Sequence, residues 1–249
     1  MNIADTLIKQ ILADVIPPRR EDFLPSDEPP IDDLLPLEVF IDAPDIEIFQ
    51  QCEPDSGEWS PDESPMSLLG SYQWMASPGV ISLYRGNIEA YWKCLLKIGH
   101  QRFPFVTAED ARYVLNLVVH SVYQHERFHY VCDFSRRLFG GQFDRLHEEA
   151  LAVAHTWQWL RAQGGNTTYG RLHPTLRRVI VQARFDYLSP GYRDWRQFAS
   201  EVDFHAAVTK YLYPASAQTF AGTNFNFAAW VLAHVPDDGN RAWEERIVP

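Results

Sequence analysis

The chain is poor in cysteine, in lysine and in long apolar segments, and each shortage excludes a class of protein. Cys52, Cys94 and Cys132 are the only cysteines among 249 residues. Their odd number and wide spacing argue against a secreted disulfide framework. No run of about 18 apolar residues is present, so we expect no transmembrane helix. Basic residues form no stripe that could follow a phosphate backbone, which argues against nucleic-acid binding. We therefore expect a cytoplasmic protein.

Negative charge is concentrated in the first quarter of the chain. The formal net charge is -11, but residues 1–65 hold 17 acidic side chains, 3 basic ones and 10 of the 17 prolines. Residues 66–249 hold 19 basic and 16 acidic side chains, a balance of +3. We interpret residues 1–65 as an acidic, proline-rich arm that docks either on its own domain or on a partner. Residues 66–249 are long enough for one globular domain.

The spacing of apolar residues predicts an α+β protein that is mostly helical. Apolar residues at helical intervals predict a short amphipathic helix over residues 2–15. Alternating residues at 79–84 predict a strand at the edge of a small sheet, and residues 46–49 fit an extended segment. Asn87 is expected to cap the helix that follows the strand.

The longest predicted helix begins at a capping box and ends at two glycines. Thr107 and Asp110 have the spacing of the capping box, and the glycines at 140–141 interrupt the apolar pattern. A second helix is predicted over residues 145–163. Further helices are expected at 172–187, 195–204 and 205–213, with a turn at 189–191.

The sequence HERFH at residues 125–129 is an HExxH motif within the longest predicted helix. His125 and His129 lie on one face of a helix, one turn apart, so both imidazoles can reach one metal ion. Glu126 lies beside them, where it can contact a metal-bound water without being a ligand. Zinc lowers the pKa of such a water towards ~7, and a carboxylate beside it can act as general base. Two histidines are too few, because a catalytic zinc normally has three protein ligands.

A third ligand is available on the next predicted helix. Residues 147–154 read HEEALAVA, in which two glutamates precede a run of small residues. Small residues allow this helix to pack closely against the one that carries the histidines. A glutamate here could therefore complete a His-His-Glu site.

This order of motifs resembles the gluzincins, the thermolysin-like zinc metallopeptidases, over the segment from the strand at 79–84 to the HEEALAVA helix. The resemblance implies a zincin-like core with His125, His129 and Glu149 as Zn²⁺ ligands and Glu126 as general base. Glu149 is preferred because the ligand in this family is typically followed by a small residue, and Glu148 is the alternative. The resemblance also implies that the strand at 79–84 pairs with an extended substrate.

Two supporting roles in this family have less obvious counterparts. The acidic residue that often supports a metal-bound histidine is missing after Glu149, and we expect Asp133, one turn after His129, to replace it. The oxyanion-stabilising residue is expected downstream. Tyr192 is preferred over the other candidates, which are His205, His234, Tyr187 and Tyr211.

The first functional interpretation is therefore a zinc-dependent metallopeptidase, with a zinc-bound water activated by Glu126. It is expected to cleave a peptide or isopeptide bond in a specific protein or peptide substrate, as in the small intracellular zinc peptidases of bacteria that it resembles. One alternative is a catalytically inactive zincin-like module that binds or regulates a partner. Another is a helix bundle in which the HExxH motif is a coincidence.

Overall fold

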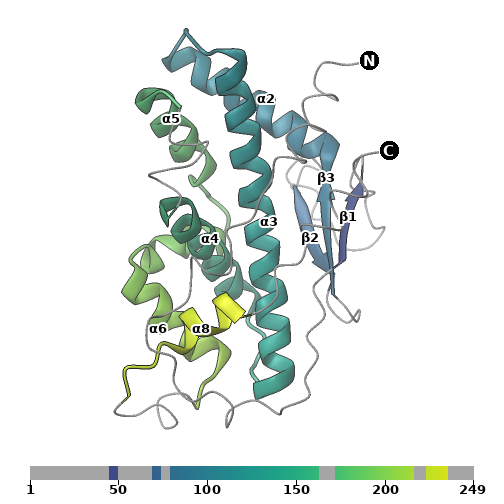
Figure 1. Cartoon of the computed structure of the whole chain (residues 1–249), viewed down its shortest axis with the longest axis vertical. Coiled ribbons are helices and arrows are strands. Elements are labelled where there is room, and N and C mark those ends of the chain that lie inside the picture. Colours follow the sequence, from purple (N-terminus) through teal and green to yellow (C-terminus); the bar gives the residue numbers. More distant parts are fainter. Residues whose placement is uncertain (1–44, 50–68, 74–78, 163–171, 216–222, 235–249) are drawn as a thin grey trace.

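The computed structural model describes residues 45–49, 69–73, 79–162, 172–215 and 223–234 (Figure 1). The predicted helix at 2–15 lies outside these residues, as does most of the acidic segment. The described part of the chain is mostly helical and contains one small sheet, as the sequence predicts. No helix in these ranges combines the length and the apolar character needed to cross a lipid bilayer.

The sheet has three strands in the order β1-β3-β2. β1 (Asp45–Phe49) pairs in parallel with β3 (Val80–Tyr84), and β2 (Gly70–Gln73) pairs with β3 in the antiparallel direction. The predicted strand at 79–84 therefore exists, but its expected position at the edge is wrong. It is the central strand because residues 45–49 of the acidic segment supply its second neighbour. The outer strand that packs against α3 is β2.

α2 (Arg85–Arg102) follows β3 without a loop. Asn87 is buried within its first turn, so the prediction that Asn87 caps the helix is wrong; Tyr84 holds the cap position without a side-chain hydrogen bond. α2 packs against α5 (Pro174–Arg184). Gly99 permits this close approach, because a Cβ atom there would lie 2.7 Å from Cδ1 of Leu176.

α3 (Ala108–Phe139) runs the length of the molecule, with the sheet on one side and α4 and α6 on the other (Figure 1). The predicted capping box is confirmed. Thr107 Oγ1 accepts a hydrogen bond from the Asp110 amide at 3.0 Å, and Asp110 Oδ2 accepts one from the Thr107 amide at 2.9 Å. The helix ends at Gly140, whose φ of 71° is the left-handed conformation that favours glycine.

The elements after α3 agree with the prediction only in part. α4 (Arg145–Ala162) lies where it is expected. The helix predicted at 195–204 is wrong, because η5 (Tyr192–Phe198) is a 3₁₀ helix that ends before Ser200. The helix predicted at 205–213 is present but begins earlier, since Ser200 caps α6 (Glu201–Leu212). Ser200 caps this helix because its Oγ accepts a hydrogen bond from the backbone N–H of Asp203 at 3.1 Å. The sequence did not predict α8 (Phe227–His234).

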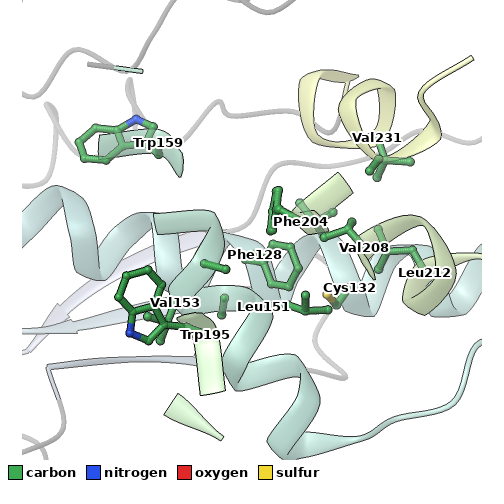
Figure 2. Close-up of a cluster of buried hydrophobic side chains, with 14 of the residues drawn as sticks. Phe128, Cys132, Leu151, Val153, Trp159, Trp195, Phe204, Val208, Leu212 and Val231 are labelled. Atoms are coloured by element: carbon green, nitrogen blue, oxygen red, sulfur yellow. The ribbon is translucent and has the colours of Figure 1, made fainter. Parts of the chain in front are cut away.

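Two buried apolar clusters pack against α3, and both include side chains of that helix. One lies between α3, α2, α5 and the sheet, and includes Ile81 and Leu176. The other lies between α3, α4, α6 and α8, where Phe128 is enclosed by residues that include Leu151 and Phe204 (Figure 2). The alanines of α4 in this second cluster are completely or almost completely buried, as expected from the small residues of the HEEALAVA segment. α3 is therefore held on two sides, which fixes the position of the HExxH motif.

A candidate metal centre

The two histidines of the HExxH motif converge on one point beside α3. His125 and His129 occupy successive turns, with ring centroids 5.0 Å apart and Nε2 atoms 3.3 Å apart. Both side chains are largely buried. The i, i+4 spacing produces this convergence because side chains four residues apart lie one above the other on a helix.

Glu149 of α4 supplies the third converging atom. Its Oε2 lies 3.0 Å from Nε2 of His125 and 3.4 Å from Nε2 of His129. The ligand atoms around a tetrahedral zinc, with bonds of about 2.0–2.1 Å, lie roughly 3.3 Å apart. The three separations therefore match one face of a tetrahedron. This His-His-Glu group can hold a metal ion.

Glu148 faces a different part of the same ring. Its Oε1 lies 2.9 Å from Nδ1 of His129, and its Oε2 accepts hydrogen bonds from Arg136 and, at 2.6 Å, from the hydroxyl of Tyr211. Three donors therefore surround a carboxylate that belongs to a residue only 2% exposed. Glu148, the alternative ligand, is thus not directed at the point where the other three side chains converge.

Asp133 does not take the supporting role that the sequence suggested. Its Oδ2 instead accepts hydrogen bonds from the hydroxyl of Tyr72 and from Arg137, each at 2.9 Å. It faces β2 rather than the metal site because it lies one turn further along α3, where Tyr72 reaches across from the sheet.

The charges at the site depend strongly on one another. Burial alone would lower the pKa of His129, but its hydrogen bonds to Glu148 and Glu149 raise that pKa to about 10. Burial alone would raise the pKa of both glutamates, but their hydrogen bonds to the histidines hold each pKa below its ordinary value. Without a metal, His129 is therefore protonated at neutral pH, and a metal ion that bound at this group would have to displace that proton.

Glu126 is buried next to the three converging residues. Burial raises its pKa, and the nearby charges of His125 and His129 partly oppose that increase. Gly70 of β2 packs directly against its side chain, since a Cβ atom at Gly70 would lie 3.2 Å from Cγ of Glu126. β2 therefore lies beside the carboxylate that the motif suggests as general base.

Tyr192 begins η5 and reaches the same site. Its ring is stacked on that of His125, and its hydroxyl donates a hydrogen bond to Glu149. Burial and the charges of Glu149 and Glu126 raise its pKa, so the hydroxyl keeps its proton. Of the other candidates for the oxyanion role, His205 contacts Asn226 and Tyr211 contacts Glu148. His234 ends α8.

Sequence reasoning missed two contributors to this region. Arg136 lies seven residues after His129, a spacing that returns to the same face of α3 and could have identified it. Arg184 of α5 is 5% exposed and donates a hydrogen bond to Ser121 Oγ at 2.9 Å. Its positive charge is one of those that oppose the increase that burial causes in the pKa of Glu126. Arg184 came from a helix with no recognisable relation to the motif.

Comparisons of the chain with protein-family models, with curated proteins and with solved structures found no significant match.

Proposed function

We propose that the chain is a zinc-dependent metallopeptidase with a zincin-like core, which cleaves an amide bond in a protein or peptide. The observation that carries the proposal is the convergence of His125, His129 and Glu149, with Glu126 buried beside them. Two imidazole nitrogens and one carboxylate oxygen are a donor set typical of catalytic zinc. When bound, zinc supplies a Lewis acid that polarises a carbonyl oxygen and makes water more acidic.

Glu126 is proposed as the general base. It takes a proton from the attacking water and passes it to the nitrogen of the leaving amine. Its buried position supports this role, because burial raises the pKa of the carboxyl towards the range in which it can both accept and return a proton.

Tyr192 is proposed to stabilise the oxyanion. Its hydroxyl remains protonated and lies at the site through its hydrogen bond to Glu149. During the reaction this one proton turns from Glu149 to the carbonyl oxygen that gains negative charge. The stack on His125 restricts the ring to one orientation, so only the hydroxyl proton has to change its partner during the reaction.

The substrate is proposed to lie along β2 as an extended peptide. β3 cannot serve, because β1 and β2 occupy both of its sides. Within the described ranges, β2 has one unpaired side, and Gly70 places the strand against Glu126. Addition of a strand to such an edge is a common mode of peptide recognition.

The decisive experiment separates metal binding from catalysis. The wild-type protein should bind one zinc ion and cleave members of a quenched fluorescent peptide library or a protein in a lysate digest. Glu126→Gln should keep the zinc and lose the cleavage, whereas His125→Ala should lose both. Glu201→Gln, which alters an exposed acid on α6, is the matched control and should retain both.

Two results would reject the proposal. One is equal zinc content in the wild type and in His125→Ala. The other is zinc binding in the wild type without any cleavage that depends on Glu126, which would favour an inactive binding module instead.

A further inference from the structure

Glu148 does not belong to the His-His-Glu group, yet its buried carboxylate contacts His129. We infer that Glu148 is a positioning residue for His129, and that Arg136 and Tyr211 hold Glu148 in place, so that α6 forms part of the metal site. The inference rests on the metal site in the proposed function and concerns how that site is built.

Both carboxylate oxygens of Glu148 have hydrogen-bond partners within the protein. His129 Nδ1 lies 2.9 Å from Oε1, while Arg136 and Tyr211 both donate to Oε2. A carboxylate that is almost fully buried is costly unless such partners compensate for the lost water. Glu148 is therefore fixed in one orientation, so it can in turn fix the orientation of the His129 ring.

The bond from Glu148 determines which nitrogen of His129 is free for a metal. With Nδ1–H donated to Glu148, the lone pair of neutral His129 lies on Nε2, the atom 3.4 Å from Glu149 Oε2 and 3.3 Å from His125 Nε2. A carboxylate on the outer nitrogen is a common way to orient a metal-binding histidine and increase its basicity. His125 is oriented differently, by the ring of Tyr192.

Two consecutive residues of α4 thus hold opposite sides of one imidazole. Glu149 reaches the Nε2 side of His129 and Glu148 reaches the Nδ1 side. A rotation or shift of α4 against α3 would break both contacts together. The completely buried alanines at 152 and 154 keep the two helices in this register.

Tyr211 connects α6 to the site through its hydrogen bond to Glu148. It lies 63 residues after Glu148, and its hydroxyl is 2.6 Å from Glu148 Oε2. Its ring also packs against His147, with centroids 5.3 Å apart. Arg136, two turns after His129 on α3, approaches the same oxygen. The network joins α3, α4 and α6 around one carboxylate.

The test measures zinc affinity by competition with a chelator, and the visible absorption spectrum of the Co²⁺-loaded protein. Glu148→Gln should weaken zinc binding by about 10- to 100-fold and alter the cobalt spectrum without changing the stoichiometry. Tyr211→Phe should weaken binding by about three- to tenfold, because the hydrogen bond that it removes acts only through Glu148. Glu149→Gln should weaken binding more than either.

Tyr72→Phe is the matched control for Tyr211→Phe. It also removes a tyrosine hydroxyl from a carboxylate, that of Asp133 on α3, but this carboxylate does not contact a metal ligand. Its zinc affinity should equal that of the wild type even if its stability falls by a similar amount. If Glu148→Gln does not fold, as judged by circular dichroism, the comparison of Tyr211→Phe with Tyr72→Phe carries the test alone.

Three outcomes would overturn the inference. Wild-type affinity in both Glu148→Gln and Tyr211→Phe would remove the positioning role while leaving an active peptidase possible. A greater loss in Glu148→Gln than in Glu149→Gln would make Glu148 the ligand. Absence of zinc binding in the wild type would reject the inference together with the proposed function.

Discussion

The aromatic ring of Tyr192 stacks on the imidazole of His125, with centroids 5.7 Å apart and planes that differ by 8°. The turn before Tyr192 makes this contact possible. Gly191 has a φ of 80°, and a Cβ atom there would lie 3.0 Å from the carbonyl oxygen of Leu146 and 3.4 Å from Cβ of Glu149. Only glycine fits this close approach to α4 in that conformation. The turn thereby delivers Tyr192 to both His125 and Glu149.

Tyr192→Phe should separate the two contributions of this residue. The phenyl ring keeps the stack on His125, while the proposed donor for the oxyanion is lost. We expect kcat to fall by about 100-fold, the scale measured when one oxyanion donor is removed. Zinc affinity should change by about tenfold at most, because the lost hydroxyl also donates a hydrogen bond to the proposed ligand Glu149. The measurement is steady-state cleavage of the best peptide substrate, together with zinc titration.

Tyr187→Phe provides the control for that experiment. Tyr187 packs against Tyr192 with ring centroids 5.4 Å apart, so its substitution tests whether loss of any hydroxyl near the turn has the same effect. Its kcat should remain close to the wild-type value. Full activity in Tyr192→Phe would exclude Tyr192 as the oxyanion donor.

Gly70→Ala should disturb the contact between β2 and the HExxH helix. The added Cβ atom would lie 2.7 Å from Cγ1 of Val122 and 3.2 Å from Cγ of Glu126, so the strand or the helix has to move. Overpacking of this kind costs about 1–3 kcal/mol of unfolding free energy. We expect that loss in urea unfolding. Peptide cleavage should also be slower, because Glu126 and β2, the proposed substrate-pairing strand, would be displaced.

Gly141→Ala is a suitable comparison for Gly70→Ala. Its added Cβ atom would meet Cγ of Arg136 at 3.4 Å, an ordinary contact, and no other atom more closely. Its stability should stay within about 0.5 kcal/mol of the wild type. Equal stability of the two variants would show that β2 and α3 adapt freely to the extra atom.

The parts of the site that depend on local spacing could be predicted from the sequence. His125, Glu126 and His129 lie on one helix, so their relative positions follow from helix geometry alone. The helix of Glu149 was recognisable from its small residues. The choice between Glu148 and Glu149 rested on the resemblance. Neighbouring residues on a helix point about 100° apart, and helix boundaries read from sequence shift by a residue or more. The sequence alone therefore does not show which of the two glutamates faces α3.

The parts that depend on distant partners could not be predicted. β3 was placed at the edge of the sheet because nothing in residues 79–84 indicates that residues 45–49 pair with it. Tyr211 was one of several candidate tyrosines, and only the packing of α6 places its hydroxyl on Glu148. Asp133 had the right spacing on α3, but Tyr72 of β2 occupies its carboxylate. In each case, tertiary pairing decides between choices that the local sequence leaves equal.

His155 should make the metal-free protein less stable in acid. It lies on α4 between Phe128 and Phe204, with its Nε2 3.3 Å from Oε1 of Gln124. Burial, and then the charge of Arg127, lowers the pKa of His155 from 6.5 to about 3. Between these two values the unfolded chain binds a proton that the folded chain does not. The free energy of unfolding therefore falls as the pH falls through this window, by about 1.4 kcal/mol per pH unit from this residue.

His155→Gln should remove that contribution, because glutamine retains a donor for Gln124 but does not titrate. We expect the difference in unfolding free energy between wild type and variant to be constant from pH 7 to 8. Below about pH 6.5 it should change in favour of the variant with the slope given by the loss of one proton. Urea unfolding in the presence of a chelator keeps metal release from contributing to the slope. Carboxylates elsewhere titrate in both proteins and cancel in the difference, so parallel curves from pH 7 down to pH 4.5 would contradict a neutral, buried His155.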